Sequence, residues 1–115
     1  MNGRDAEILR QILRYCREIQ MAIAHFGDDE ALFLQNPVYR NAIAMPLQQI
    51  GELAGHLTDG FMQTHDEIPW KQVKGMRTWF AHQYLAMDSE LIWSTAKEDV
   101  AFLEASCQKW LDLEA

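Results

Sequence analysis

Apolar residues recur at spacings of three and four along most of this 115-residue chain. Such spacing places them on one side of an α-helix, which turns once every ~3.6 residues. No segment alternates apolar and polar residues as a half-buried β-strand does, and no tight hairpin turn joins β-rich runs. The pattern therefore predicts an all-α protein, an antiparallel bundle of four to five helices in a single domain over residues 1–115.

The first apolar stripe predicts a long helix over about 5–26, which ends before Gly27. Glycine tolerates the backbone conformations that commonly follow a helix, so it is a typical stop. Asp28 is suited to cap a short helix through residues 31–33, because its carboxylate can accept a free backbone N–H.

Asn36 followed by Pro37 predicts the start of a second long helix, with an N-cap residue and a proline at the first helical position. Its apolar stripe continues to Leu57. Pro46 falls inside the stripe, so we expect a kink there rather than a break. The polar segment Thr58–Glu67 is predicted to be a connector.

The second half of the chain restarts a helix at Pro69, and Asp88 is suited to cap a last helix that continues to near residue 115. All the tryptophans lie in this half, which suggests that apolar surface extends beyond one core. A homodimer face explains this plainly, although aromatic-rich cores of monomers are also common. The residues concerned are Trp70, Trp79, Trp93 and Trp110.

The net charge of −7 counts against a general nucleic-acid binder, because phosphate neutralisation supplies most non-specific affinity. The charge is unevenly distributed, however. Residues 68–87 contain no Asp or Glu but include Lys71, Lys74 and Arg77, so this window carries +3 and the remainder −10 (7 basic against 17 acidic residues). A local anion site on an acidic body and a chance gap in acidic residues explain this equally well.

The two cysteines, Cys16 and Cys107, are far apart and form no CxxC or His-paired motif. This usage favours a reduced, cytoplasmic chain over a disulfide-linked one. The charged N-terminus is unlike a secretory signal, and no stretch is apolar enough for a transmembrane helix, so no membrane partner is expected.

Chemically versatile side chains concentrate in residues 77–84, Arg-Thr-Trp-Phe-Ala-His-Gln-Tyr. His82 can take and give a proton near neutrality, and the planar guanidinium of Arg77 suits a phosphate. Together they could cleave a ribose–phosphate bond without a metal, and Tyr84 could orient a substrate or accept a modification. A satisfied histidine and a solvated arginine are the simpler alternative.

Helix geometry constrains this pair. On an ideal helix Arg77 and His82 diverge by about 140°, so an intact helix would not direct both at one phosphate. Either the helix ends near Ala81, or a twofold dimer supplies the partner groups from a second chain. The dimer would also provide two histidines, one as base and one as acid.

The run Arg-x4-His-x-Tyr over 77–84 resembles the signature of the HEPN superfamily, and specifically of its HepT-like toxin branch. Two further segments resemble the family in the same order. Residues 41–54, ending in Ile-Gly-Glu-Leu-Ala, look like its Ile-Gly-Glu-Ala helix, and 67–71 look like its Ile-Pro-Trp restart. The isolated motif is weak, but the ordered combination in a helical chain of this length is much more specific.

The resemblance implies a HEPN-like, dimeric bundle that is a metal-independent endoribonuclease, the toxin of a type VII-like toxin–antitoxin pair. Arg77 and His82 would be its catalytic residues, in an active site composed across the homodimer. A cognate minimal nucleotidyltransferase antitoxin would add AMP to Tyr84. RNA would be the substrate, and no cofactor is implied.

Thr78 departs from the family pattern, since many active members have Asn, Asp or His directly after the arginine. An alternative is therefore a catalytically inactive HEPN scaffold that docks a nucleotidyltransferase or a nucleotide. A plain dimeric helical bundle is a third possibility, but it leaves the ordered motifs unexplained.

Lys71, Lys74 and Thr78 are candidate RNA-binding residues beside the motif, although a solvated helix face explains the lysines equally well. Glu52 and His56 share a helix face at a spacing of four, as in half of a metal site. Without a second such pair they are far more typical of a solvated helix, so no metal site is predicted.

Overall fold

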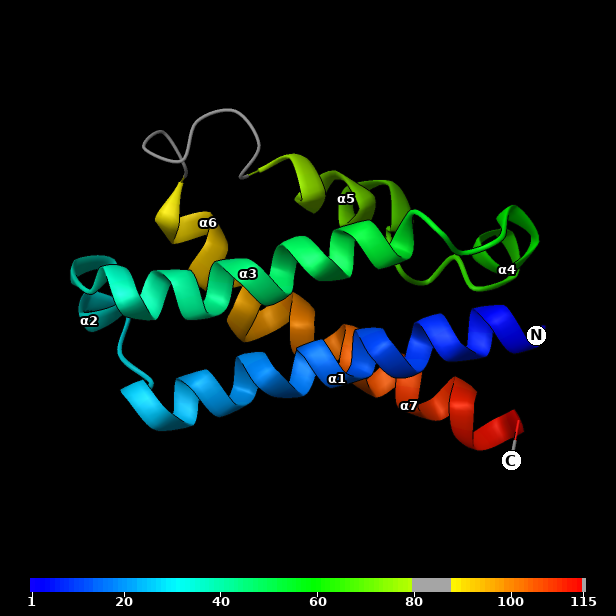
Figure 1. Ribbon diagram of the computed structural model, residues 1–115, viewed down its shortest axis with the longest axis horizontal. Coiled ribbons are helices and arrows are strands. Elements are labelled where there is room, and N and C mark those ends of the chain that lie inside the picture. The colour runs from blue at the N-terminus through cyan, green and yellow to red at the C-terminus, as the bar shows by residue number, and fades with distance from the viewer. Residues whose placement is uncertain (80–87, 115) are drawn as a thin grey trace.

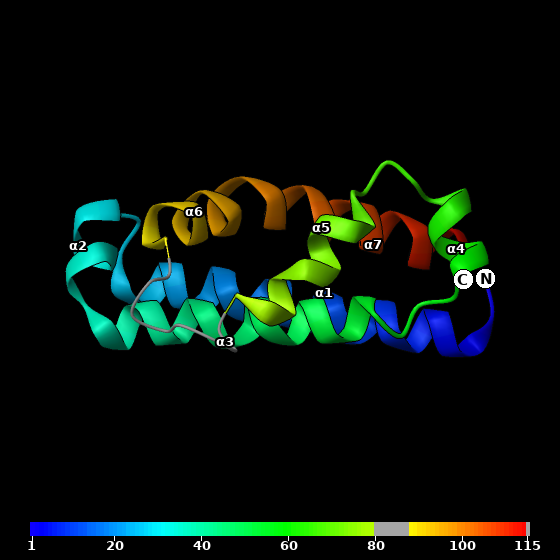
Figure 2. The same ribbon diagram turned by 90° about the horizontal axis from the view of Figure 1, so that it is seen from above.

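Two long helices, α1 (Gly3–Phe26) and α3 (Pro37–Ala54), lie side by side along the long axis of the computed structural model (Figure 1). The structure describes residues 1–79 and 88–114. A third long helix, α7 (Val100–Glu114), packs along α1 in a second layer (Figure 2). Every regular element in these ranges is helical, which confirms the all-α prediction.

The first helix begins two residues before its predicted start, because Asn2 caps it by accepting the Asp5 N–H at 2.7 Å. It ends before Gly27 as predicted. The glycine has a φ of 116°, and its N–H donates to the carbonyl of Ile23. A side chain would strain this backbone conformation, so glycine is needed for the turn.

The cap of the short helix α2 (Glu30–Gln35) was predicted one residue too early. Asp29, not Asp28, accepts the N–H of Leu32. The Asp29 N–H bonds to the Gly27 carbonyl, so this tight turn extends one residue further before the helix starts. Asp28 instead forms a 2.6 Å ion pair with Lys97 near the other end of the sequence.

The N-terminus of α3 is formed as predicted, with the Asn36 side chain accepting two backbone N–H groups. The helix continues through the buried Pro46, so the prediction that the proline does not break it is confirmed. It ends at Ala54 instead of Leu57. The Leu57 N–H bonds to the Ala54 carbonyl, three residues back, as in the tightened last turn of many helices.

The segment predicted to be a connector contains a helix, α4 (Asp59–Thr64), and this prediction was wrong. Thr58 caps it by accepting the Phe61 N–H, and Phe61 is buried. Thr58 itself bonds to Asp5 through its N–H and its hydroxyl, at 3.0 and 2.7 Å. One buried side chain and one distant carboxylate therefore stabilise a helix whose sequence is mostly polar.

The last predicted helix is interrupted. Asp88 caps it as expected, but α6 (Ser89–Ser94) passes into a π-helical turn, η3 (Thr95–Asp99), before α7 begins. Such turns insert one extra residue into an α-helix and have no simple sequence signature. The predicted start of this segment and its helical conformation are therefore correct, but it is not one continuous α-helix.

The core lies between the two layers and is built from the predicted stripes together with Trp70, Trp93 and Trp110. Cys16 and Cys107 are free thiols inside it. Burial raises the pKa of Cys107 to about 12 and that of Cys16 further above its usual range. Burial therefore favours the protonated form of both thiols in the folded protein.

The buried Asp5 carboxylate gives a direct test of how α4 is attached to α1. Asp5→Ala leaves two Thr58 donors without an acceptor, so we expect the free energy of unfolding to fall by about 2–3 kcal/mol. Asp28→Ala, which removes an exposed ion pair with Lys97, should cost less than about 1 kcal/mol. Urea unfolding measures both, and equal effects would contradict this account.

Candidate functional site

The segment that contains Arg77 folds as a short helix, α5 (Trp70–Gly75), followed by a 3-10 turn, η1 (Met76–Thr78). It starts after Pro69, as the sequence predicts. The buried indole of Trp70 donates to the carbonyl of His65 at 2.9 Å. Val73 and Met76 are also buried, so the opposite side of the segment faces solvent.

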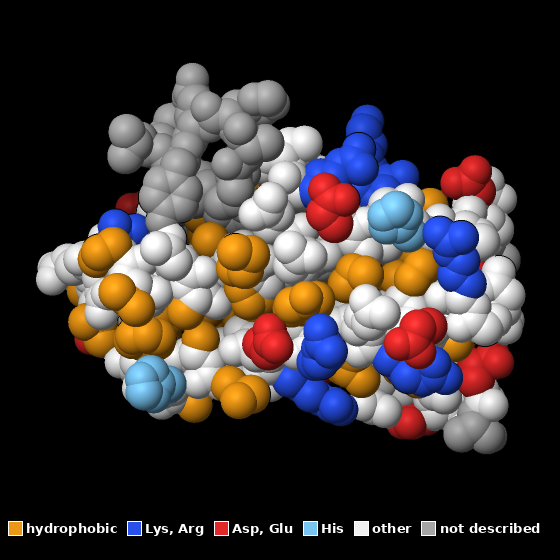
Figure 3. Space-filling view, viewed as in Figure 1, with side chains coloured by type: hydrophobic (Ala, Val, Ile, Leu, Met, Phe, Trp, Pro, Cys, Tyr) orange, Lys and Arg blue, Asp and Glu red, His pale blue; other side chains and the backbone are white. Residues whose placement is uncertain are grey.

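Three cations at a spacing of three form a basic row on this outer side: Lys71, Lys74 and Arg77. A 3-10 turn has about three residues per turn, so η1 keeps Arg77 in line with the lysines. Within residues 1–79 and 88–114, no carboxylate forms an ion pair with any of the three. Figure 3 shows lysine and arginine side chains gathered over α5.

The basic row forms no ion pair with the described residues, although Asp59 and Asp66 line the same hollow as Lys71 and Lys74. Arg77 and Lys71 are exposed, and Lys74 is half-buried. An exposed guanidinium without a carboxylate partner keeps its donors available for a phosphate. Of the predicted RNA-binding residues, the two lysines therefore lie beside Arg77 on one surface.

Thr78, the third predicted RNA-binding residue, is exposed at the end of η1. Its hydroxyl donates to the Gly75 carbonyl at 2.8 Å, which satisfies a backbone acceptor at the end of α5. The hydroxyl proton is therefore used locally, and only the lone pairs of the oxygen face outward. Thr78 thus ends a helix, a role for which threonine is well suited.

The α-helix ends at Gly75, before Arg77, rather than near Ala81. Because η1 and a turn at Trp79 follow, the angle expected on one continuous helix does not apply between Arg77 and the rest of the motif. His82 and Tyr84 lie outside the described residues. Their roles, and their convergence with Arg77, remain predictions.

A close contact with α3 positions η1. A Cβ built on Gly51 would lie 2.5 Å from the backbone nitrogen of Arg77, and one on Gly55 would lie 3.4 Å from its Nη1 atom. This contact was not predicted from the sequence. The glycine is visible in the Ile-Gly-Glu segment, but the neighbouring sequence does not show which residues pack against a helical glycine.

The family comparison decides how these residues are interpreted. The model of a family described as "Ribonuclease HepT-like" matches residues 8–110, which is most of the chain. The chain belongs to the HepT-like ribonuclease family. The match spans the α3 glycines, the basic row and the whole 77–84 motif, so the resemblance seen in the sequence is confirmed.

Curated relatives give the same result for this HepT-like chain. A protein of Thermococcus cleftensis named "Probable ribonuclease HepT" is 32% identical over 104 residues, 90% of this chain and 86% of that one. A protein of Caldanaerobacter subterraneus subsp. tengcongensis named a "Putative RNase" is 28% identical over 92% of this chain and 93% of its own length. No solved structure matches the chain significantly.

An apolar groove of about 420 Å³ accompanies the HepT-like motif between η1 and the α6–α7 segment. Met76 and Trp79, which flank Arg77 and Thr78 in sequence, line one side of it. Phe102, which is 53% exposed, lines the other side. Trp70, Trp93 and Trp110 lie in the core, as in the aromatic-rich core that was the alternative expectation, and Trp79 lines this groove.

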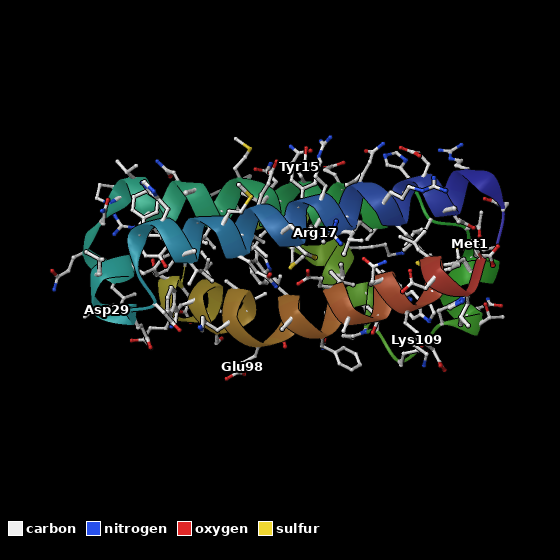
Figure 4. All side chains as sticks on the ribbon, turned by 90° about the horizontal axis from the view of Figure 1, so that it is seen from below. Met1, Tyr15, Arg17, Asp29, Glu98 and Lys109 are labelled. Atoms are coloured by element: carbon white, nitrogen blue, oxygen red, sulfur yellow. The ribbon has the colours of Figure 1, made fainter. Side chains whose placement is uncertain are left out.

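Three arginines of α1 in this HepT-like chain, Arg10, Arg14 and Arg17, contact neighbouring side chains. Arg17 lies on the side of α1 that faces α7 (Figure 4), where it donates to Gln108 at 2.8 Å. Arg10 pairs with Glu7 at 2.9 Å, and Arg14 lies over the ring of Tyr15. These three arginines of α1 therefore do not form a second free basic surface.

No metal site competes with this interpretation in the described ranges 1–79 and 88–114, where His, Cys, Asp and Glu form no cluster of three. Glu52 in the last turn of α3 and His56 in the turn that follows this helix are both exposed, as expected for a solvated pair. In the same ranges, no helix has the length and apolarity that a membrane crossing requires.

Proposed function

We propose that this chain is an endoribonuclease that cleaves RNA by proton transfer, and that it is the toxin of a toxin–antitoxin pair. The observation that carries the proposal is the exposed Arg77 guanidinium, which forms no ion pair with residues 1–79 or 88–114, within the basic row of a chain from the HepT-like ribonuclease family. A fixed cation with free donors is what a transition state with phosphate charge requires.

The mechanism needs no metal, because the side chains supply each step. His82 of one chain removes the proton of the ribose 2′-OH, and the oxygen attacks the adjacent phosphorus. Arg77 stabilises the charge that develops on the phosphate oxygens. The bond to the 5′-oxygen then breaks, and a second imidazole donates a proton to that leaving oxygen, which gives a cyclic phosphate and a free 5′-hydroxyl.

The second imidazole is best supplied by a second copy of the chain. One histidine cannot readily be base and acid in the same turnover, whereas two related by a twofold axis can divide the roles. We therefore propose a homodimer with a composite site in which each protomer contributes Arg77 and His82.

Tyr84 is proposed to be the regulatory residue, to which a minimal nucleotidyltransferase antitoxin transfers AMP from ATP. The tyrosine oxygen attacks the α-phosphorus of ATP, and pyrophosphate leaves. The adduct carries a negative phosphate two residues from His82, where it would repel and exclude the RNA phosphate. Inhibition by charge and bulk requires no rearrangement of the helices.

Removing either catalytic residue should abolish RNA cleavage while leaving the bundle folded. His82→Ala and Arg77→Ala are each expected to lower the cleavage rate by about 100-fold or more, since each removes transition-state stabilisation. The assay is degradation of labelled RNA by the purified protein in EDTA. Equal activity of the three proteins, or strict dependence on added metal, would end the assignment.

The basic row predicts how RNA binding depends on salt. Lys71→Gln and Lys74→Gln should each weaken binding of single-stranded RNA and reduce the salt dependence by roughly one phosphate contact, about 0.7 in slope. Lys109→Gln, which alters an exposed lysine on α7, is the matched control (Figure 4). Identical slopes for all three variants would show that the row does not contact RNA.

The proposed modification predicts a covalent change that mass spectrometry detects. Co-expression with a cognate nucleotidyltransferase should add one or more AMP groups to the wild-type chain and suppress its nuclease activity. Tyr84→Phe removes the accepting oxygen, so it should remain unmodified and active. Modification of Tyr84→Phe to the same extent would place the accepting residue elsewhere.

The alternative of an inactive scaffold is favoured by one observation at Thr78. Its hydroxyl proton is directed to the Gly75 carbonyl, whereas many active relatives have an Asn, Asp or His at this position. Expression of the chain alone separates the two functions. A ribonuclease toxin arrests growth unless His82 is replaced, whereas a scaffold causes no arrest in either form.

A further inference from the structure

Gly51 and Gly55 occupy helical backbone where glycine has no local advantage. Gly51 lies inside α3, and Gly55 follows it with φ of −64° and ψ of −15°, which any residue adopts. Glycine is less favourable than alanine at such positions, because it loses more conformational freedom on folding. The reason for both glycines must therefore lie in what packs against them.

At Gly51 the neighbour is the backbone of η1. A Cβ there would lie 2.5 Å from the Arg77 nitrogen, 3.1 Å from the Val73 oxygen and 3.2 Å from the Arg77 Cα. Backbone atoms cannot rotate away as the end of a flexible side chain can. Any side chain at Gly51 would thus push Arg77 away from α3.

At Gly55 the neighbour is the guanidinium itself. A Cβ there would lie 3.4 Å from Arg77 Nη1 and 3.3 Å from the Glu52 carbonyl oxygen. Gly51 is buried, whereas Gly55 is exposed. The backbone of Arg77 therefore contacts α3 at the buried Gly51. Its side chain extends along α3 to the surface, where the guanidinium lies over Gly55.

We propose that Gly51 and Gly55 form a glycine seat that positions Arg77, the first through its backbone and the second through its guanidinium. The role in catalysis rests on the proposed ribonuclease function. Arginine has many rotamers, and a guanidinium held in advance stabilises a transition state without first being ordered. The two glycines are positioning residues, since neither has a side chain that could touch RNA.

Three glycine variants separate positioning from folding. A methyl group at Gly55 would make only ordinary contact with Arg77 Nη1, so the test there uses a larger side chain. Gly55→Leu should displace the guanidinium and lower kcat by about 10-fold with KM little changed, because the displaced group acts in the transition state. Gly51→Ala shifts the Arg77 backbone and should cost about 100-fold, as a misplacement of about 1 Å can. Gly75→Ala is the matched control, because its Cβ meets nothing within 4 Å and its backbone is helical.

Gly55→Leu decides the proposal if Gly51→Ala fails to fold. Combined with Arg77→Ala, it should leave the residual activity of that single variant unchanged, since no guanidinium remains to be moved. A further loss in the double variant, at an unchanged folded fraction, would mean a purely structural role and would overturn the proposal.

A readout independent of cleavage is the NMR signal of the Arg77 Nε–H group, assigned by its loss in Arg77→Lys. We expect Gly55→Leu to shift this signal and Gly75→Ala to leave it in place. An unshifted signal in Gly55→Leu overturns the seat. Absence of ribonuclease activity in the wild-type protein would instead defeat the proposed function, while the signal would still decide whether the glycines position the arginine.

Discussion

The contact of η1 with α3 at Gly51 is the interaction on which the candidate site depends. Helices as short as α5 and η1 are not stable in isolation, because nucleation costs more than a few hydrogen bonds return. Their stability comes from the buried Trp70, Val73 and Met76 and from the close backbone approach to α3. The direction in which Arg77 leaves the surface is therefore set by tertiary packing, not by helix propensity.

The sequence predicts the elements that are stabilised locally. The long helices are predicted by their apolar stripes and their cap residues, and Asn36 and Asp88 are N-caps as expected. The wrong predictions have a common cause. Each of these elements depends on a partner that is distant in sequence or on a small change in backbone conformation. Helix α4 has little apolar pattern of its own. Its cap residue Thr58 is bonded to Asp5, which is far away in sequence, so the local sequence does not reveal this helix. The π-helical turn has no pattern of its own.

The candidate site was likewise predictable only in part from the sequence. Charge in residues 68–87 indicated the basic row, because three cations without acidic neighbours are visible in a linear sequence. Whether those cations are paired is a property of the fold, and the arginines of α1 show the opposite outcome, with Arg10 and Arg17 held by carboxylates. The glycine seat was not predictable, because Gly51 and Arg77 meet only through the packing of α3 on η1.

The acidic body and the basic row are compatible properties of one protein. A chain of net charge −7 has weak long-range attraction for a polyanion, so affinity must come from local cations such as Lys71 and Lys74 beside Arg77. Catalysis gains from interactions made in the transition state and gains nothing from uniformly tight binding of substrate. The basic row, with the positioned guanidinium of Arg77, lies on an acidic body that repels the rest of the RNA. This arrangement therefore favours brief contact and release over a lasting complex.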